Sequence, residues 1–175
     1  MEYIKIESES LSMKLFANFK RHQTVTKCWR KIDGKWCIKE ITFIDDWTER
    51  EYTELIAYLK NTVITGGMLL GAFYNKELKG FISIEHNLFG KNKEYLDLSN
   101  IHVSEDMREK GVGKELFQYA KRWAKEHGAR KLYISAHSAV ESQAFYKAMG
   151  CVEAEEYNQE HVEKEPCDCQ LECKV

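Results

Sequence analysis

The pattern of apolar and polar residues divides the chain into short strands and amphipathic helices. Helical spacing is clearest between Gly111 and Gly128, where the recurring apolar residues are Val112, Leu116, Ala120, Trp123 and Ala124. A helix from Thr48 to about Val63 is also predicted, because Thr48 and Glu51 have the spacing of a reciprocal capping box. Two further helices are expected, at Leu11–Phe19 and Ala139–Met149.

Strands are predicted where apolar runs are bounded by turn residues. Asp33 and Gly34 form a pair favoured in two-residue hairpins, so an N-terminal hairpin is expected around them. The predicted strands are Tyr3–Ile6, Thr24–Ile32, Lys35–Phe43, Met68–Tyr74, Lys79–Glu85, Tyr95–Val103, Lys131–Ser135, Cys151–Tyr157 and Asp168–Lys174. Residues 68–103 should form an antiparallel meander, and the helix after them should cross over to a parallel strand. The expected fold class is α/β of the α+β type, with a mixed, mostly antiparallel central sheet, one splayed parallel pair and flanking helices.

Composition places few limits on function. The chain of 175 residues is 43% hydrophobic, which predicts a single domain over residues 1–175 with a substantial core. Its apolar runs are too short to cross a bilayer, and a net charge of −2 argues against general nucleic-acid binding. The first ten residues lack an apolar secretory segment, so we expect a cytoplasmic protein without membrane or nucleic-acid partners. Whether it is a monomer or a homodimer stays open.

Six cysteines allow two interpretations, and reduced thiols are preferred over disulfides in a cytosolic chain. Cys167, Cys169 and Cys173, with His161 upstream, contain the residue types of a zinc site but lack CxxC spacing. Because the three cysteines alternate at period two, we interpret them as core-facing thiols of a terminal strand and expect no metal.

The segment IHVSEDMREKGVGK, residues 101–114, joins a predicted strand to a helix through a turn that contains Gly111 and Gly113. The first amides of a helix have no intrahelical partner and lie at the positive end of its dipole, so this turn favours an anion. The P-loop pattern fails, because Lys114 is followed by Glu115 and Arg108 replaces the first glycine. The dinucleotide pattern GxGxxG also fails at its third glycine. An ordinary connection between strand and helix is the simpler alternative.

The motif RxxGxG that remains, from Arg108 to Gly113, resembles the coenzyme A pyrophosphate loop of the GNAT superfamily of N-acyltransferases. The segment FYKAMG, ending at Gly150, resembles the family's next helix, which carries Tyr146. The resemblance covers residues 95–151 and implies acetyl-CoA as co-substrate. Many members have an asparagine where this chain has Ala139. The residues implied in cofactor binding are Ile101, His102, Val103, Arg108, Glu109, Lys110, Gly111, Val112, Gly113, Lys114, Ser138 and Tyr146.

The resemblance also implies catalytic roles. Main-chain groups of Ile101–Val103 are expected to bind pantetheine and polarise the acetyl carbonyl. Tyr146 occupies the general-acid position, with a packed core tyrosine as the alternative. Asp97 is the first candidate for the base and is expected to share a face with Ile101 and Val103. Glu85 is the second candidate, a water chain is a third possibility, and His102 is expected to project to the opposite face as a structural histidine.

The acceptor implied is a primary amine of a small molecule. A protein or peptide acceptor and a non-catalytic acyl-CoA-binding module are the alternatives. Acidic residues gather at 45–54 and 153–168, where they could attract a cationic amine or form solvated faces. Three tryptophans could line an acceptor pocket or fill the core: Trp29, Trp36 and Trp47.

Overall fold

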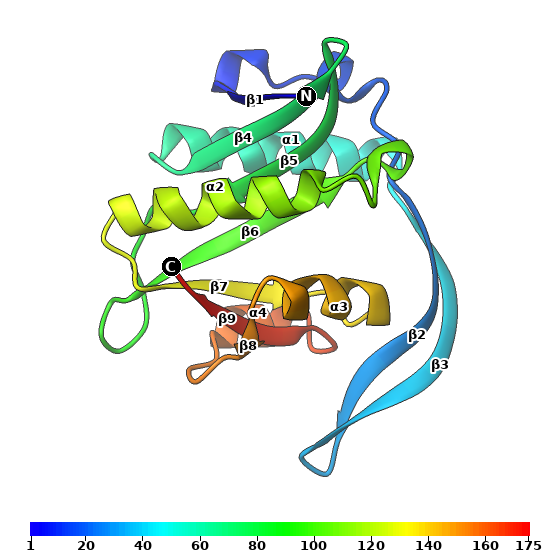
Figure 1. The fold of residues 1–175 in the computed structure, drawn as a ribbon, viewed down its shortest axis with the longest axis vertical. Coiled ribbons are helices and arrows are strands. Elements are labelled where there is room, and N and C mark those ends of the chain that lie inside the picture. Colours follow the sequence, from blue (N-terminus) through cyan, green and yellow to red (C-terminus); the bar gives the residue numbers. More distant parts are fainter.

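A computed structural model describes residues 1–175 and shows a seven-stranded sheet with helices on both faces, together with a separate two-stranded sheet (Figure 1). The strand order is β1-β4-β5-β6-β7-β9-β8 in the larger sheet and β2-β3 in the smaller one. Only β6 and β7 are parallel neighbours, which confirms the predicted fold class. The elements are β1 (Glu2–Lys5), β2 (His22–Ile32), β3 (Lys35–Asp46), α1 (Glu49–Ile64), β4 (Met68–Tyr74), β5 (Glu77–Ile84), β6 (Tyr95–Val103), α2 (Val112–Glu126), β7 (Lys131–Ala136), α3 (Val140–Ala148), β8 (Val152–Glu153), α4 (Gln159–Lys164) and β9 (Cys169–Lys174).

The parallel pair is closed at one end and open at the other. Strands β6 and β7 are in register only over Tyr95–Asp97 and Lys131–Tyr133, and their carboxyl ends separate beyond this point. At the closed end, the Nζ of Lys131 lies 3.0 Å from a carboxylate oxygen of Glu172 and 3.3 Å from the Tyr95 hydroxyl. This buried polar contact joins the strands on either side of β7, so the sheet is held together at its closed end.

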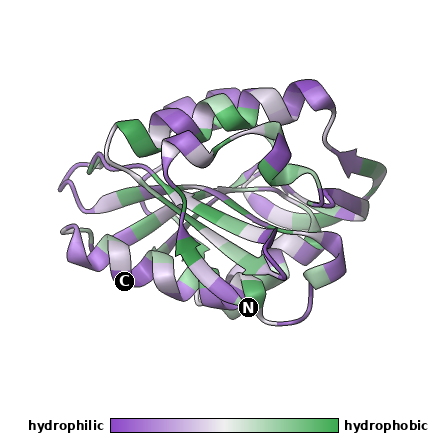
Figure 2. Cartoon of the chain, turned by 90° about the horizontal axis from the view of Figure 1, so that it is seen from above, coloured by the Kyte–Doolittle hydropathy of each residue, from purple (hydrophilic) through white to green (hydrophobic).

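Apolar side chains fill the space on both faces of the large sheet. Figure 2 shows the apolar stretches, in green, along the strands and helices. Helix α2 lies in front of the sheet in Figure 1 and buries Leu116, Phe117 and Ala120 in the larger cluster. Helix α1 lies behind the sheet and buries Ile56 and Leu59 in the smaller one. The predicted capping box of α1 is confirmed, since Thr48 and Glu51 each accept a hydrogen bond from the other's amide.

The predicted N-terminal hairpin forms the smaller sheet. Strands β2 and β3 pair around Asp33 and Gly34, whose φ angles of 49° and 75° are those of the expected tight turn. Both strands extend further than predicted, to His22 and Asp46. The hairpin curves away from the large sheet in Figure 1, and the amide of Trp29 attaches it by donating to the carbonyl of Ser138, 2.8 Å away.

The helix predicted at Leu11–Phe19 is wrong. The segment contains two short 3-10 turns, at Ser8–Ser10 and Met13–Phe16. The buried side chains are those of Leu11, Phe16 and Phe19, and this spacing does not follow one face of an α-helix. The turns instead wrap these three side chains around the cluster under α1.

The C-terminal region also departs from the prediction. The strand expected at Cys151–Tyr157 is reduced to Val152–Glu153, and α4 follows where no helix was expected. Cys169 and Cys173 face the core as predicted, whereas Cys167 precedes the strand and is exposed. All six cysteines are free, and no group of three or more His, Cys, Asp or Glu side chains is arranged to hold a metal ion.

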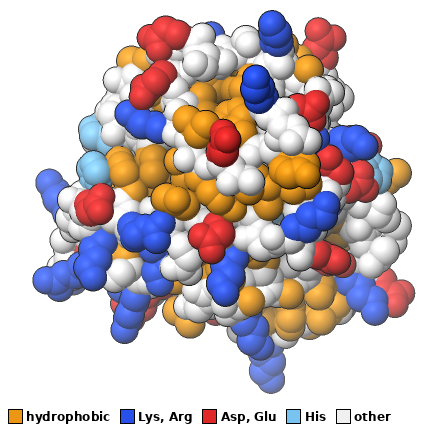
Figure 3. Space-filling view, turned by 45° about the horizontal axis from the view of Figure 1, so that its top comes forward, with side chains coloured by type: hydrophobic (Ala, Val, Ile, Leu, Met, Phe, Trp, Pro, Cys, Tyr) orange, Lys and Arg blue, Asp and Glu red, His pale blue; other side chains and the backbone are white.

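The surface mixes charges of both signs. On the face shown in Figure 3, Lys and Arg side chains are interspersed with Asp and Glu, as the small net charge suggests. None of the helices combines the length and the apolar character needed to span a bilayer.

Candidate active site

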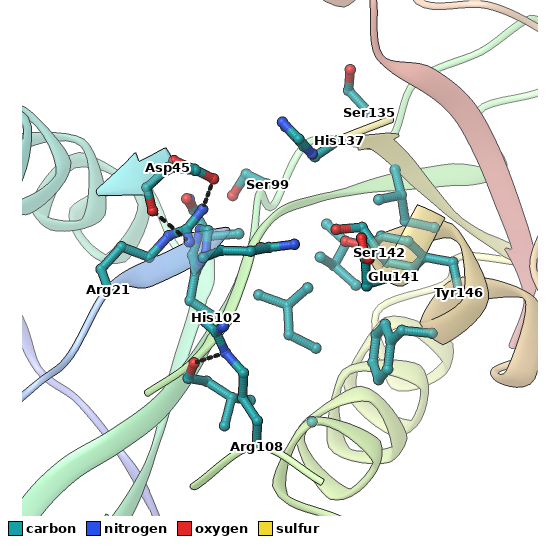
Figure 4. Close-up of a pocket in the computed structure, with 18 of the residues that line it drawn as sticks. Arg21, Asp45, Ser99, His102, Arg108, Ser135, His137, Glu141, Ser142 and Tyr146 are labelled. Carbon is teal, nitrogen blue, oxygen red and sulfur yellow. Dashed lines mark hydrogen bonds and ion pairs between the residues drawn. The ribbon is translucent and has the colours of Figure 1, made fainter. Parts of the chain in front are cut away.

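A cleft of about 1160 Å³ opens where β6 and β7 separate. Its lining comes from the ends of both strands, the turn before α2, the helices α1, α3 and α4, and the base of the hairpin. Figure 4 shows Arg21, His102 and Arg108 on one wall, facing Glu141 and Tyr146 of α3 on the other. The position agrees with the rule that open α/β sheets bind ligands beyond the carboxyl ends of diverging strands.

The turn before α2 presents unpaired main-chain amides to this cleft. The first amide of the helix with a backbone acceptor is that of Glu115, which donates to the carbonyl of Gly111 at 3.1 Å. The amides of Val112, Gly113 and Lys114 precede it and have no acceptor in the chain, and no side chain caps the helix. Such a row of N–H groups at a helix N-terminus fits a phosphate.

Both glycines of the turn are required by its geometry. Gly111 has φ of 80°, a left-handed conformation that other residues adopt only at a cost. A β-carbon on Gly113 would lie 3.2 Å from the ring of Phe145 and 3.5 Å from Val103, so a side chain there would crowd these two lining residues of the cleft.

The basic residues of the turn differ in where they point. Arg108 lines the cleft, and its Nε donates to the carbonyl of Val103 at 3.3 Å. Lys114 also lines the cleft and forms no ion pair within the chain. Lys110 lies outside the lining of the cleft, and its Nζ donates a hydrogen bond to the carbonyl of Asp106 at 2.8 Å. Arg108 and Lys114 are thus the cations available to an anion in the cradle.

Tyr146 is buried in the wall formed by α3. Its ring packs edge-on against Phe145 and Phe117, and its hydroxyl makes no hydrogen bond within the protein. Burial raises the pKa of this phenol above its usual value of about 10, so the group is protonated at neutral pH. Since Tyr146 lines the cleft, a protonated hydroxyl without a protein partner is available there.

Alternation along β6 is interrupted. The register with β5 shifts at Ser99, which has no partner residue on that strand. Beyond this bulge Ile101 and Val103 pack into the cluster under α2, whereas Asp97 lies on the other face and contacts His161. The prediction that Asp97 shares a face with Ile101 and Val103 is wrong, because one extra residue reverses the alternation.

The same shift places His102 on the face of Asp97. The prediction that His102 projects to the opposite face is therefore wrong. The imidazole packs against Trp47 and Phe81, with ring centroids 4.6 and 5.3 Å away. Burial lowers the pKa of His102 to about 3, so the ring is neutral at physiological pH. Of the three tryptophans considered for the pocket, Trp47 alone lines the cleft.

The two carboxylates predicted as bases lie behind the lining of the cleft. The Oδ2 of Asp97 is 2.6 Å from the Nε2 of His161. One oxygen of Glu85 accepts hydrogen bonds from the hydroxyls of Thr62, Tyr58 and Ser99, at 2.8, 3.0 and 2.8 Å. His161, Tyr58 and Ser99 line the cleft, so each acid reaches it through a neighbour.

Ser138, predicted to contact the cofactor, lies outside the lining of the cleft. Its hydroxyl accepts a hydrogen bond from Arg30 of the hairpin at 2.6 Å. The acidic run at 45–54 is largely engaged as well, since Asp45 pairs with Arg21 and Glu54 with Arg50.

Two cleft residues were missed by the sequence interpretation. The sequence interpretation places Asp168 in an acidic run and at the start of a strand, and it names His161 only in the zinc-site alternative that it does not favour. Asp168 and the neighbouring Glu165 line the cleft without a cationic partner in the chain. Burial, with Glu165 nearby, raises the pKa of Asp168 to about 6. Asn158 at a good N-cap position was the available signal for α4, the helix that carries His161.

Comparison with known proteins decides the family. The family model for acetyltransferases of the GNAT type matches residues 32–151, more than half of the chain. The chain belongs to the GNAT acetyltransferase family. No curated protein matches the sequence of this acetyltransferase.

Solved structures with the same fold cover the whole chain. Nourseothricin acetyltransferase is 13% identical with a TM-score of 0.70, over 99% of this chain and 97% of that chain. A putative streptothricin acetyltransferase from Bacillus anthracis str. Ames, in complex with acetyl coenzyme A, is 18% identical with a TM-score of 0.70, over 100% and 99%. The PaiA N-acetyltransferase from Thermoplasma acidophilum, in complex with coenzyme A, is 16% identical with a TM-score of 0.61, over 99% and 98%. At identities this low, the similarity shows a shared fold and nothing about the acceptor.

GNAT acetyltransferases use acetyl-CoA as co-substrate, as the sequence resemblance implied. The residues of the cleft fit this molecule, since unpaired amides at 112–114 suit a diphosphate. Arg108 and Lys114 would supply compensating charge, and the unpaired edge of β6 would offer backbone groups to the amides of the pantetheine arm.

Proposed function

We propose that this GNAT acetyltransferase transfers the acetyl group of acetyl-CoA to a primary amine of a small molecule, by direct attack in a ternary complex. The observation that carries the proposal is a single cleft lined by the amide turn before α2, the unpaired end of β6 and the phenol of Tyr146. Nourseothricin acetyltransferase and a protein described as a putative streptothricin acetyltransferase have the same fold, which supports a small-molecule acceptor.

The backbone of β6 supplies the electrostatic part of the proposed mechanism. Beyond Asp97, β6 has no neighbour on its β7 side, so alternate N–H and C=O groups of 99–103 face the cleft. An N–H directed at the acetyl oxygen stabilises the negative charge that develops there when the amine attacks. Such a donor commonly contributes about 3–4 kcal/mol to the transition state.

Tyr146 is proposed as the acid that protonates the departing thiolate of coenzyme A. Its phenol is protonated at neutral pH and has no competing partner in the protein. Proton transfer to the sulfur as the C–S bond breaks removes the cost of releasing a free thiolate.

The side of the cleft lined by Glu165 and Asp168, which we call the acceptor side, supports a cationic substrate. Asp168 and Glu165 face it without a positive partner, whereas Asp45 and Glu54 are each paired with an arginine. An uncompensated carboxylate pair raises the local concentration of cations and favours an ammonium over an anionic or neutral acceptor.

The test is release of thiol from acetyl-CoA in the presence of streptothricin, spermidine, glucosamine or a lysine-containing peptide. We expect turnover with at least one of the small amines and a rate with the peptide at least about 10-fold lower. Preferential turnover of the peptide would replace the proposed acceptor class. Binding of acetyl-CoA in calorimetry without turnover on any acceptor would refute the enzymatic proposal.

A further inference from the structure

The side chains of Asp97 and His161 meet at the point where β6 and β7 separate. Asp97 and Tyr133 are the last residue pair that joins the two strands. The ring of His161, on α4, stacks on Tyr133 with centroids 5.8 Å apart and an angle of 26°, while its Nε2 lies 2.6 Å from Asp97. His161 therefore covers the base of the open end and faces the cleft.

The pair is ordered from the interior outward. The side chain of Asp97 is 14% exposed and that of His161 is 25% exposed, so the carboxylate lies behind the imidazole. A carboxylate only accepts hydrogen bonds, so in the neutral imidazole Nε2 carries the shared proton and Nδ1 keeps its lone pair. Nδ1 makes no hydrogen bond within the protein. The oriented ring thus leaves one nitrogen free to accept a proton.

We propose that His161 is the catalytic base of the acetyl transfer and that Asp97 is the positioning residue that holds its tautomer and orientation. The inference rests on the proposed function and assigns the proton acceptor that function requires. An amine substrate is mainly an ammonium ion at neutral pH, and an ammonium has no lone pair with which to attack.

The acetyl transfer conserves protons and electron pairs. Nδ1 of His161 accepts one proton from the ammonium, and the lone pair released forms the N–C bond to the acetyl carbon. As the C–S bond breaks, its electrons stay on sulfur, which takes the proton of the Tyr146 hydroxyl. The new amide nitrogen loses its extra proton, which restores the phenol, and His161 returns its proton to water.

Other titratable groups near the cleft are less suited to this role. His102 stays neutral, packed between aromatic rings, and Nδ1 of His137 accepts a hydrogen bond from the amide of Ala139 at 3.2 Å. The reachable oxygen of Glu85 already accepts three hydrogen bonds. Among these four groups, the imidazole on α4 alone combines a free acceptor with a carboxylate behind it.

The charges around His161 make it a stronger base than a free imidazole. The groups that face it are Asp97 and Tyr133 on the strands, Asp168 before β9, and Glu160 and Lys164 on its own helix. The hydrogen bond and charge of Asp97 raise the pKa of His161 above the ordinary value of about 6.5, against the opposing effects of burial and Lys164. Burial raises the pKa of Asp97, and its bond to His161 acts in the opposite direction.

The test compares wild type with His161→Gln, using spermidine and hydroxylamine as acceptors. Spermidine is protonated at neutral pH and needs a base, whereas hydroxylamine is largely unprotonated. We expect kcat for spermidine at pH 7 to fall about 100-fold or more, and kcat for hydroxylamine to fall less than about 5-fold. The acidic limb of the spermidine profile should move to higher pH, towards the pKa of the amine itself.

A second variant tests the positioning role. Asp97→Asn keeps an acceptor for Nε2–H but removes the charge, so the acidic limb of kcat should move to lower pH, with about a 10-fold loss at pH 7. His127→Gln, a matched change at the exposed histidine that follows α2, should leave rate and profile unchanged. Calorimetry with acetyl-CoA checks that each variant is folded.

Three outcomes would overturn the assignment or its basis. Equal losses for both acceptors in His161→Gln would show that the histidine does not take the ammonium proton. An unshifted limb in Asp97→Asn would reduce Asp97 to a structural role. A wild-type enzyme that acetylates no acceptor would remove the proposed function and this inference with it.

Discussion

At the scale of single residues, Tyr146 carries the clearest functional prediction. Replacing it with Phe removes only a hydroxyl that has no protein partner, so folding and acetyl-CoA affinity should be retained. Turnover should fall about 100-fold, because the thiolate then leaves without a positioned acid. Steady-state kinetics and calorimetry measure the two effects separately. Tyr74→Phe, at an exposed position outside the cleft, is the matched control, and equal rates for both variants would remove Tyr146 from the acid role.

Asp168 gives a prediction for stability. Its folded-state pKa of about 6 is higher than the usual value near 4, so the native protein binds the proton more tightly than the unfolded chain does. The ionised carboxylate destabilises the fold above pH 6, and this cost disappears as the pH falls towards 4. Asp168→Asn should therefore stabilise the protein by about 2 kcal/mol at pH 7.5 and much less at pH 4.5.

Urea unfolding at the two pH values measures this difference. An equal effect of Asp168→Asn at both would show that the carboxylate is not held in an unfavourable site. The expected result would instead indicate that a destabilising charge is retained at the acceptor side of the cleft, as is common where function sets the residue.

At the scale of elements, the turn before α2 should bind the diphosphate through its backbone. Gly113→Asp places a side chain in the cradle, near Phe145, and adds a negative charge. Acetyl-CoA affinity should fall at least about 100-fold, as expected when an anion site is blocked and its charge reversed. Gly113→Asn is the isosteric neutral control and should lose less. Calorimetry decides, and unchanged affinity in the Asp variant would contradict the assignment of the turn.

Elements with local signals were predictable from sequence. Helix α2, its glycine turn and the hairpin around Asp33 and Gly34 each depend on residues close together in the chain. Apolar spacing and turn chemistry report such structure directly. The capping box at Thr48 and Glu51 belongs to the same class, because both partners lie within one helical turn.

Features set by long-range packing were not predictable in this way. The bulge at Ser99 depends on the register of β6 with β5, and no residue near it marks the shift. Helix α4 has six residues, too few to show a helical period, so the position of His161 was missed. The helix predicted at 11–19 was wrong for a related reason, since packing against α1 overrode the apparent helical periodicity of that segment.

At the scale of the whole molecule, the co-substrate should act as a bridge. The two parts of the large sheet share only the short register between β6 and β7, and the proposed ligand would contact residues on both sides of the opening. Coenzyme A at 100 times its Kd should stabilise the fold by about 3 kcal/mol. Hydrogen exchange should slow at residues 99–103 and 111–116 and stay unchanged at the hairpin tip. Protection confined to other regions would place the ligand elsewhere.

The walls of the cleft come from different stretches of chain. The segment 95–148 supplies the groups proposed to handle the thioester, whereas the hairpin base, α1 and α4 supply the opposite side. Exchange of these flanking segments between relatives would retarget the enzyme to another nucleophile and leave donor chemistry intact. Diversification of acceptor choice would then proceed in the segments on either side of an inherited middle.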